Sequence, residues 1–144
     1  MAYWLAKTEP ESFSYNDLET LGRDRWNGVR NFAALKHMKQ MNIGDLVFIY
    51  HTGKEKAIAG VAEIISQPYP DPDEGDPRFV VVDVIPRYRL DRPVTLKEIK
   101  ASPLFTDWEL VRQSRLSVMP ATSKYWQAIH SMANRNDTQP KMKS

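Results

Sequence analysis

The chain has 144 residues, of which 42% are hydrophobic and 26% charged, and it has no cysteine. This length and balance predict a globular domain rather than a disordered or fibrous chain. The lack of thiols excludes a disulfide-stapled fold and thiolate metal sites. The net charge of +2 falls within residues 134–144, so residues 1–133 are formally neutral and a poor non-specific binder of nucleic acid.

The apolar runs are all shorter than the roughly 20 residues that a membrane span needs. The start of the chain, MAYW, lacks the basic and long apolar regions of a signal peptide. We therefore expect a cytoplasmic protein with no membrane partner. Residues 134–144 are mostly polar, which predicts a disordered tail after a single domain at 1–133.

The first part of the chain predicts a strand and a capped helix. Residues 3–7 form a short apolar run typical of a strand. Ser14 as N-cap and Asp17 three residues later form a capping box, which predicts a helix over 15–21. Gly22 is suited to end that helix.

A loop at 26–31 and a second helix follow. Asn31 can cap this helix, and Phe32, Leu35 and Met38 recur on one face, which we expect to be buried. The apolar runs at 46–50 and 57–65 predict two strands, joined by a hairpin at 51–56.

The last part mixes strands with short helices. A Pro- and Asp-rich loop at 68–77 precedes the β-branched run 79–85, which we expect to be the central strand. Thr95 and Glu98 repeat the capping box, so a helix begins at 96. A strand at 115–119 and a final helix capped by Thr122 complete the chain. Neighbouring strands within 44–92 predict an α+β fold, a small, mainly antiparallel barrel or bent sheet with peripheral helices.

Familiar catalytic patterns are missing from the sequence. The glycine spacing forms neither a dinucleotide fingerprint nor a P-loop, and there is no nucleophile elbow. The three histidines, His37, His51 and His130, are not spaced as metal ligands. We therefore expect a binding protein rather than an enzyme, with no cofactor and no metal.

The loop at 26–31 (WNGVRN) combines groups that recognise a base. Trp26 offers a ring that can stack on a base, and Arg30 and Asn31 offer donors that can read its edge. The alternative is that Trp26 belongs to the core, Gly28 turns the chain, and Asn31 only caps the second helix. The residues alone leave both interpretations open.

Several blocks, in order, resemble the EVE domain family. They are WLAKTEP at 4–10, WNGVRN at 26–31, GDLVFIYH at 44–51, AGVAE at 59–63, YPDP at 69–72, PVTL at 93–96 and RLSV at 115–118. The resemblance spans residues 2–132. It implies a PUA-like barrel with helices at its rim, related to the YTH domains, which bind N6-methyladenine through an aromatic cage.

The resemblance also implies a set of ligand-binding residues. Trp26 falls where a YTH cage tryptophan falls, and Tyr69 is the aromatic residue available in the loop that supplies further cage residues. The implied set comprises Lys7, Thr8, Asp17, Trp26, Asn27, Arg30, Asn31, His51, Tyr69, Arg115 and Ser117.

Each transferred residue has a structural alternative. Asp17 can merely close its capping box, Lys7 can be a solvated strand end, and Thr8 can start the turn before Pro10. His51 can lie at the barrel rim without a ligand, and Tyr69 can cover the loop prolines. Arg115 and Ser117 can belong to a strand with one solvated face.

Together these features favour a non-catalytic reader of a modified base in DNA or RNA. One alternative is a sensor of a free modified nucleotide or nucleoside, which suits the neutral body. Another is an enzyme acting on such a nucleotide, with Asp17 or His51 as acid or base. The sequence leaves the modification, the choice between DNA and RNA, and the oligomeric state open, and is compatible with a monomer.

Overall fold

A computed structural model describes residues 1–134 of the chain. The predicted tail lies outside the described residues, except for Asn134, the last residue of the final helix. The elements in chain order are β1 Tyr3–Thr8, α1 Tyr15–Leu21, β2 Asp24–Trp26, α2 Phe32–Met38, β3 Leu46–His51, β4 Ala57–Ile64, β5 Tyr69–Pro70, β6 Val80–Thr95, α3 Leu96–Ala101, the 3₁₀ turn η1 Pro103–Phe105, α4 Glu109–Arg112, β7 Val118–Ala121 and α5 Ser123–Asn134.

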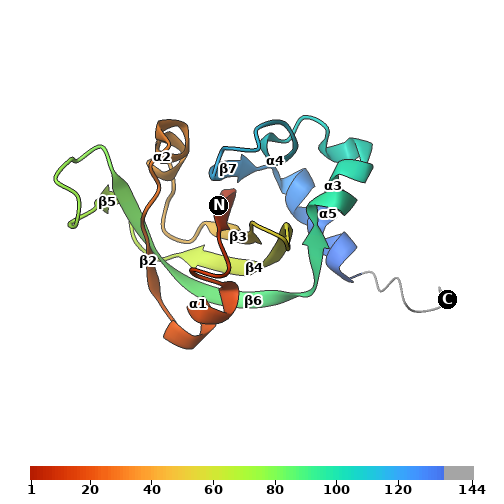
Figure 1. The fold of residues 1–144 in the computed structure, drawn as a ribbon, viewed down its shortest axis with the longest axis horizontal. Coiled ribbons are helices and arrows are strands. Elements are labelled where there is room, and N and C mark those ends of the chain that lie inside the picture. Colours follow the sequence, from red (N-terminus) through yellow and green to blue (C-terminus); the bar gives the residue numbers. More distant parts are fainter. Residues whose placement is uncertain (135–144) are drawn as a thin grey trace.

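The strands form one strongly curled sheet in the order β2-β6-β4-β3-β1-β7, with β5 paired to β6. All pairs are antiparallel except β1 with β3. Helices α3, α4 and α5 gather at one end of the molecule, and α1 lies below β6 (Figure 1). The predicted α+β class, a mainly antiparallel curved sheet with peripheral helices, is confirmed.

Local side-chain caps set the helix boundaries where the sequence predicts them. Ser14 and Asp17 exchange both bonds of the α1 capping box, and Gly22 ends the helix in the left-handed conformation. Thr95 and Glu98 form the same kind of capping box at the start of α3. In α5, Trp126, Ile129 and Ala133 are buried.

The predicted inner face of α2 is partly wrong. Leu35 and Met38 are buried, together with Ala34, but Phe32 is 53% exposed. As the first residue of the helix, Phe32 instead lies against Phe79 of the neighbouring loop, with ring centroids 5.6 Å apart. The contact between two surface rings replaces burial in the core.

The strand predictions also differ in detail. The run at 79–85 is the start of the long strand β6, which is second from one end of the sheet rather than central. The strand expected at 115–119 is observed at Val118–Ala121. The sequence does not predict β2, β5, η1 or α4. These are short elements held by neighbouring segments rather than by a periodic pattern of their own.

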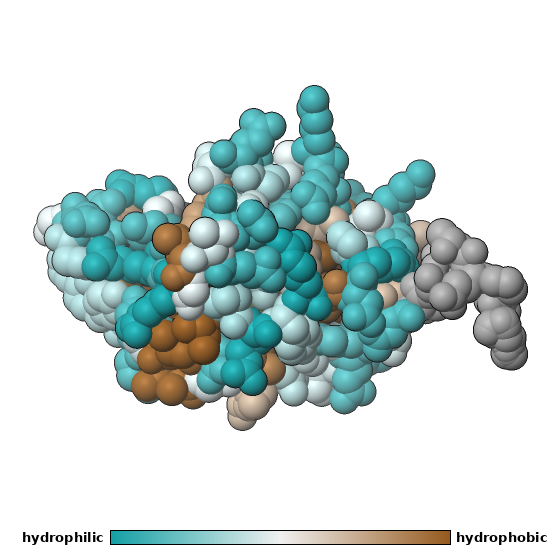
Figure 2. Space-filling model, turned by 90° about the horizontal axis from the view of Figure 1, so that it is seen from below, coloured by the Kyte–Doolittle hydropathy of each residue, from teal (hydrophilic) through white to brown (hydrophobic). Residues whose placement is uncertain are grey.

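The core is one continuous apolar cluster between the concave sheet and its helices. The face that carries α1 is mostly hydrophilic, interrupted by a compact hydrophobic patch (Figure 2). Within residues 1–134, no helix has the length and apolar character needed to cross a membrane.

Candidate functional site

The main candidate site is a pocket where distant parts of the sheet approach one another. Strand β2 stands at one end of the sheet order and β7 at the other, yet residues of β2, of β1 and of the segment before β7 line the same pocket. Its volume is about 400 Å³. The lining residues are Lys7, Thr8, Phe13, Asp24, Trp26, Asn27, Gly28, Val29, Arg30 and Ser117.

The short strand β2 decides which side chains face the pocket. It pairs with β6 through Asp24 to Val84, Arg25 to Asp83 and Trp26 to Val82. Because successive side chains of a strand point to opposite faces, Asp24 and Trp26 share the pocket side. Arg25 lies on the other side, where its guanidinium is 3.4 Å from Asp73.

Trp26 is both a core residue and a pocket wall. It is only 7% exposed, and its ring also borders the apolar interior beside Met38 and Val82. On the pocket side it meets Phe13 edge to face, with the planes at 78° and the ring centroids 6.1 Å apart. Trp26 therefore belongs to the core, as one interpretation of the sequence held, and it also lines the pocket that the other interpretation requires.

Polar groups from the end of β1 also line the pocket. The Lys7 ammonium donates to the carbonyl of Ser114 at 3.0 Å, and partial burial lowers the Lys7 pKa. The Lys7 backbone N–H donates to the Ser117 carbonyl at 2.9 Å, which holds Ser117 at the pocket. Thr8 donates its hydroxyl to the carbonyl of Phe13 at 2.7 Å.

Asp24 is a pocket residue that the sequence does not predict. It is partly buried, and burial raises the pKa of its carboxyl group, with a smaller contribution from the nearby Asp83. A carboxylate in this position can accept hydrogen bonds from an amino group. No sequence pattern marks Asp24 as a site residue, because it belongs to a strand of three residues that forms only by pairing with β6.

The loop after β2 closes the pocket. Gly28 has a φ of 78°, which the tryptophan-containing loop needs for its turn and which other residues rarely adopt. Asn27 and Arg30 line the rim. The Arg30 guanidinium is held 2.6 Å from Glu74 and lies over the Phe79 ring, 4.2 Å from its centroid.

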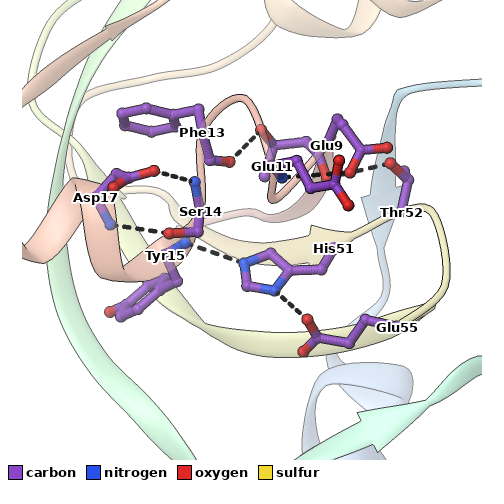
Figure 3. Close-up of polar contacts among 10 residues, drawn as sticks. Glu9, Glu11, Phe13, Ser14, Tyr15, Asp17, His51, Thr52 and Glu55 are labelled. Atoms are coloured by element: carbon purple, nitrogen blue, oxygen red, sulfur yellow. Dashed lines mark hydrogen bonds and ion pairs between the residues drawn. The ribbon is translucent and has the colours of Figure 1, made fainter.

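Five of the expected site residues lie outside this pocket, and Asp17, His51 and Tyr69 are three of them. Asp17 closes the α1 capping box. His51 accepts the Tyr15 N–H at its Nε2, 3.0 Å away, and its Nδ1 lies 2.9 Å from Glu55 (Figure 3). Since Nε2 accepts, Nδ1 carries the proton and donates to Glu55. Tyr69 donates its hydroxyl to Asp83 at 2.7 Å.

Asn31 and Arg115 meet in a second hollow of about 340 Å³. Asn31 caps α2 by accepting the Ala34 N–H at 3.0 Å. Arg115 is exposed. The sequence-predicted residues are thus divided between a pocket, a neighbouring hollow and positions with other structural partners.

The described residues contain no group of three or more His, Cys, Asp or Glu side chains arranged to hold a metal ion. The pocket lining offers rings, hydroxyls, an ammonium, a guanidinium, an amide and one carboxylate. Such a set can enclose a planar ligand and hydrogen-bond to its edge.

Comparison with known proteins decides the family. The family model "EVE domain" matches residues 2–132. The chain belongs to the EVE domain family. Thymocyte nuclear protein 1 of Danio rerio is 31% identical over 168 residues, a match that covers 92% of this chain and 72% of that protein.

Solved structures agree with the EVE assignment. Rpa0253 from Rhodopseudomonas palustris superposes with a TM-score of 0.88 at 42% identity, covering 92% of this EVE domain and 93% of that chain. Human THYN1, solved in complex with DNA that contains 5-methylcytosine, superposes with a TM-score of 0.87 at 28% identity. That match covers 94% of this chain and 99% of the human one.

Proposed function

We propose that this EVE domain binds nucleic acid that carries a modified base, and that the pocket beside Trp26 receives that base. The proposal rests on one observation. Aromatic rings line the same pocket as two charged groups, Asp24 and Lys7, that can hydrogen-bond to the edge of a base. A relative of the same fold, human THYN1, was solved with DNA containing 5-methylcytosine, which supports the choice of ligand.

The size and walls of the pocket suit a single base. Its volume of about 400 Å³ lies within the range of about 300–1,000 Å³ of small-ligand sites. A base inside a duplex would have to be unstacked and turned outward to enter it. Trp26 and Phe13 then provide ring surface, and stacking on one ring is worth about 1–3 kcal/mol per base.

The polar groups favour a base with an exocyclic amino group. Asp24 can accept from such a group, as carboxylates do from N4 of cytosine. Lys7 brings only donors, which suit ring nitrogen or carbonyl acceptors of the same base. Val29 adds an apolar wall, against which a methyl group can be buried. These features support 5-methylcytosine as the first ligand to test.

A sensor of a free modified nucleoside is the second candidate. It is favoured by the formal neutrality of residues 1–133, since strand binding depends on neutralised phosphates. The enzyme alternative has less support, because Asp17 and His51 both have other partners and neither lines the pocket.

A competition titration tests the proposal. Two single-stranded DNA oligonucleotides of one sequence, with cytosine or 5-methylcytosine at one position, are compared with free 5-methyl-2′-deoxycytidine at low and moderate salt. Burial of one methyl group is worth about 0.8 kcal/mol, so the methylated strand should bind about fourfold more tightly.

The salt series separates the two candidates. Strand binding should weaken as salt rises, whereas binding of the neutral nucleoside should not. Equal affinity for the methylated and unmethylated strands would refute the reading of this modification. Binding of the nucleoside without any gain from the strand would favour the sensor.

A further inference from the structure

The second hollow lies directly beside the base pocket. Its lining residues are Asn31, Ala33, Arg112, Gln113, Ser114, Arg115 and Leu116. Arg30 and Ser117 line the pocket. Their chain neighbours, Asn31 and Leu116, line the second hollow, so both chain segments run from the pocket into the hollow. The bond from Lys7 to the Ser114 carbonyl, 3.0 Å, joins the two across their boundary.

Arg115 differs from every other arginine among residues 1–134. The other eight each contact a carboxylate: Arg23 with Asp83, Arg25 with Asp73, Arg30 with Glu74, Arg78 with Asp76, Arg87 with Glu63, Arg89 with Glu19, Arg92 with Glu98 and Arg112 with Asp107. Arg115 is exposed and has no acidic partner within the described part of the chain. Its guanidinium is therefore available to an external anion.

The charges around the pocket differ from one side to the other. On the side of the loop before β6, the acids Asp73 and Glu74 already neutralise Arg25 and Arg30. On the side of the second hollow, none of the described lining residues is acidic. A polyanionic strand that places a base in the pocket would therefore continue toward Arg115 rather than toward the acidic loop.

We infer that the second hollow binds the sugar-phosphate of the nucleotide next to the base in the pocket, with Arg115 as the phosphate contact. Guanidinium groups match phosphate oxygens in a two-pronged geometry. Gln113 and Asn31 add amide groups at the same hollow. This inference rests on the proposed function and makes the ligand a strand rather than a free base.

Arg115→Gln tests this assignment, with Lys97→Gln as the matched control. Lys97 is also exposed and has no acidic partner within residues 1–134, but it lies on α3 in a different hollow. The probe is the oligonucleotide with one 5-methylcytosine. Arg115→Gln should weaken binding about tenfold, the loss expected for one charged hydrogen bond, and lower the salt slope by about 0.7. Lys97→Gln should leave both unchanged.

A chemical change in the strand makes the test specific. Neutral methylphosphonates replace, one at a time, the phosphates on either side of the modified base. One of these methylphosphonates should weaken strand binding to the wild-type protein as much as Arg115→Gln weakens binding of the unmodified-backbone strand. The same methylphosphonate should cause no further loss of affinity in Arg115→Gln. Arg115→Lys should retain the salt slope, and free 5-methyl-2′-deoxycytidine should bind Arg115→Gln as it binds the wild type.

The outcomes separate this inference from the proposed function. If the wild type prefers the methylated strand and Arg115→Gln behaves like Lys97→Gln, the phosphate assignment is overturned and the base pocket stands. If Arg115→Gln weakens binding of the free nucleoside as much as it weakens binding of the strand, Arg115 acts through the pocket. The phosphate assignment is then also overturned. If the wild type binds neither strand nor nucleoside, both proposals fail.

Discussion

Single residues of the candidate site also have a structural role. Trp26 is 7% exposed and touches both the apolar interior and the pocket. Removing its side chain would therefore lower folding stability by about 3–5 kcal/mol and remove a pocket wall as well. A measurement that observes the intact indole separates these roles better than an alanine substitution does.

Asp24 is expected to bind ligand at a cost in stability. Burial raises its pKa above 3.8 in the folded protein, so the charged carboxylate is less favourable there than in the unfolded chain. Asp24→Asn should therefore be at least as stable as the wild type at neutral pH, and should bind the 5-methylcytosine strand more weakly. Thermal melting and a binding titration on the same samples measure both effects.

The pH dependence of this variant has a definite sign. Because the folded-state pKa is raised, the cost of the Asp24 charge is fully present above that pKa and disappears as pH falls below 3.8. Any advantage of Asp24→Asn in melting temperature should shrink over that interval. A variant that melts well below the wild type at neutral pH would show that the Asp24 charge stabilises the fold.

Among the elements, helix α1 packs closely against strand β4 at Gly60. Tyr15 lies over Gly60 of β4 and donates its hydroxyl to the Val61 carbonyl at 2.7 Å. A Cβ at Gly60 would stand 2.7 Å from the Tyr15 ring and 2.9 Å from the Tyr88 carbonyl oxygen. The contact leaves no room for a larger residue.

Gly60→Ala should therefore destabilise the protein. Overpacking of this kind costs about 1–3 kcal/mol, which corresponds to a fall of several degrees in melting temperature. Gly75→Ala is the matched control, because a Cβ there meets nothing within 4 Å. Equal melting temperatures for the two variants would show that Tyr15 is not held tightly against β4.

In the molecule as a whole, the elements that the sequence predicts are those held by local contacts. Helices α1 and α3 were predictable because their capping boxes lie within a few adjacent residues. Strand β2 was not, since it has three residues and two of them are charged; its pairing with β6 creates it. For the same reason the sequence does not predict Asp24 as a site residue, although it does predict Trp26, two residues later.

The site itself depends on topology. Lys7, Trp26 and Ser117 are far apart in sequence, and the curl of the sheet brings them to one pocket. Asp17, His51 and Tyr69 were expected there from the family resemblance, but local partners hold them elsewhere. Whether a polar side chain faces a ligand or satisfies its neighbours depends on these long-range contacts.

The proposed function requires that a modified base occupies the pocket beside Trp26. The most direct measurement follows the indole N–H signals of the four tryptophans by nuclear magnetic resonance while the 5-methylcytosine strand is added. The Trp4 and Trp108 indoles donate to Asp45 and to the Pro120 carbonyl, both at about 3 Å, and serve as internal controls. Trp26→Phe assigns the signal of interest.

We expect the Trp26 signal to move with a saturating dependence on strand concentration, because ring currents from a stacked base act over short distances. The Trp4 and Trp108 signals should remain in place. A Trp26 signal that stays fixed while binding saturates, or that moves no more than those of Trp4 and Trp108, would contradict the placement of the base in this pocket.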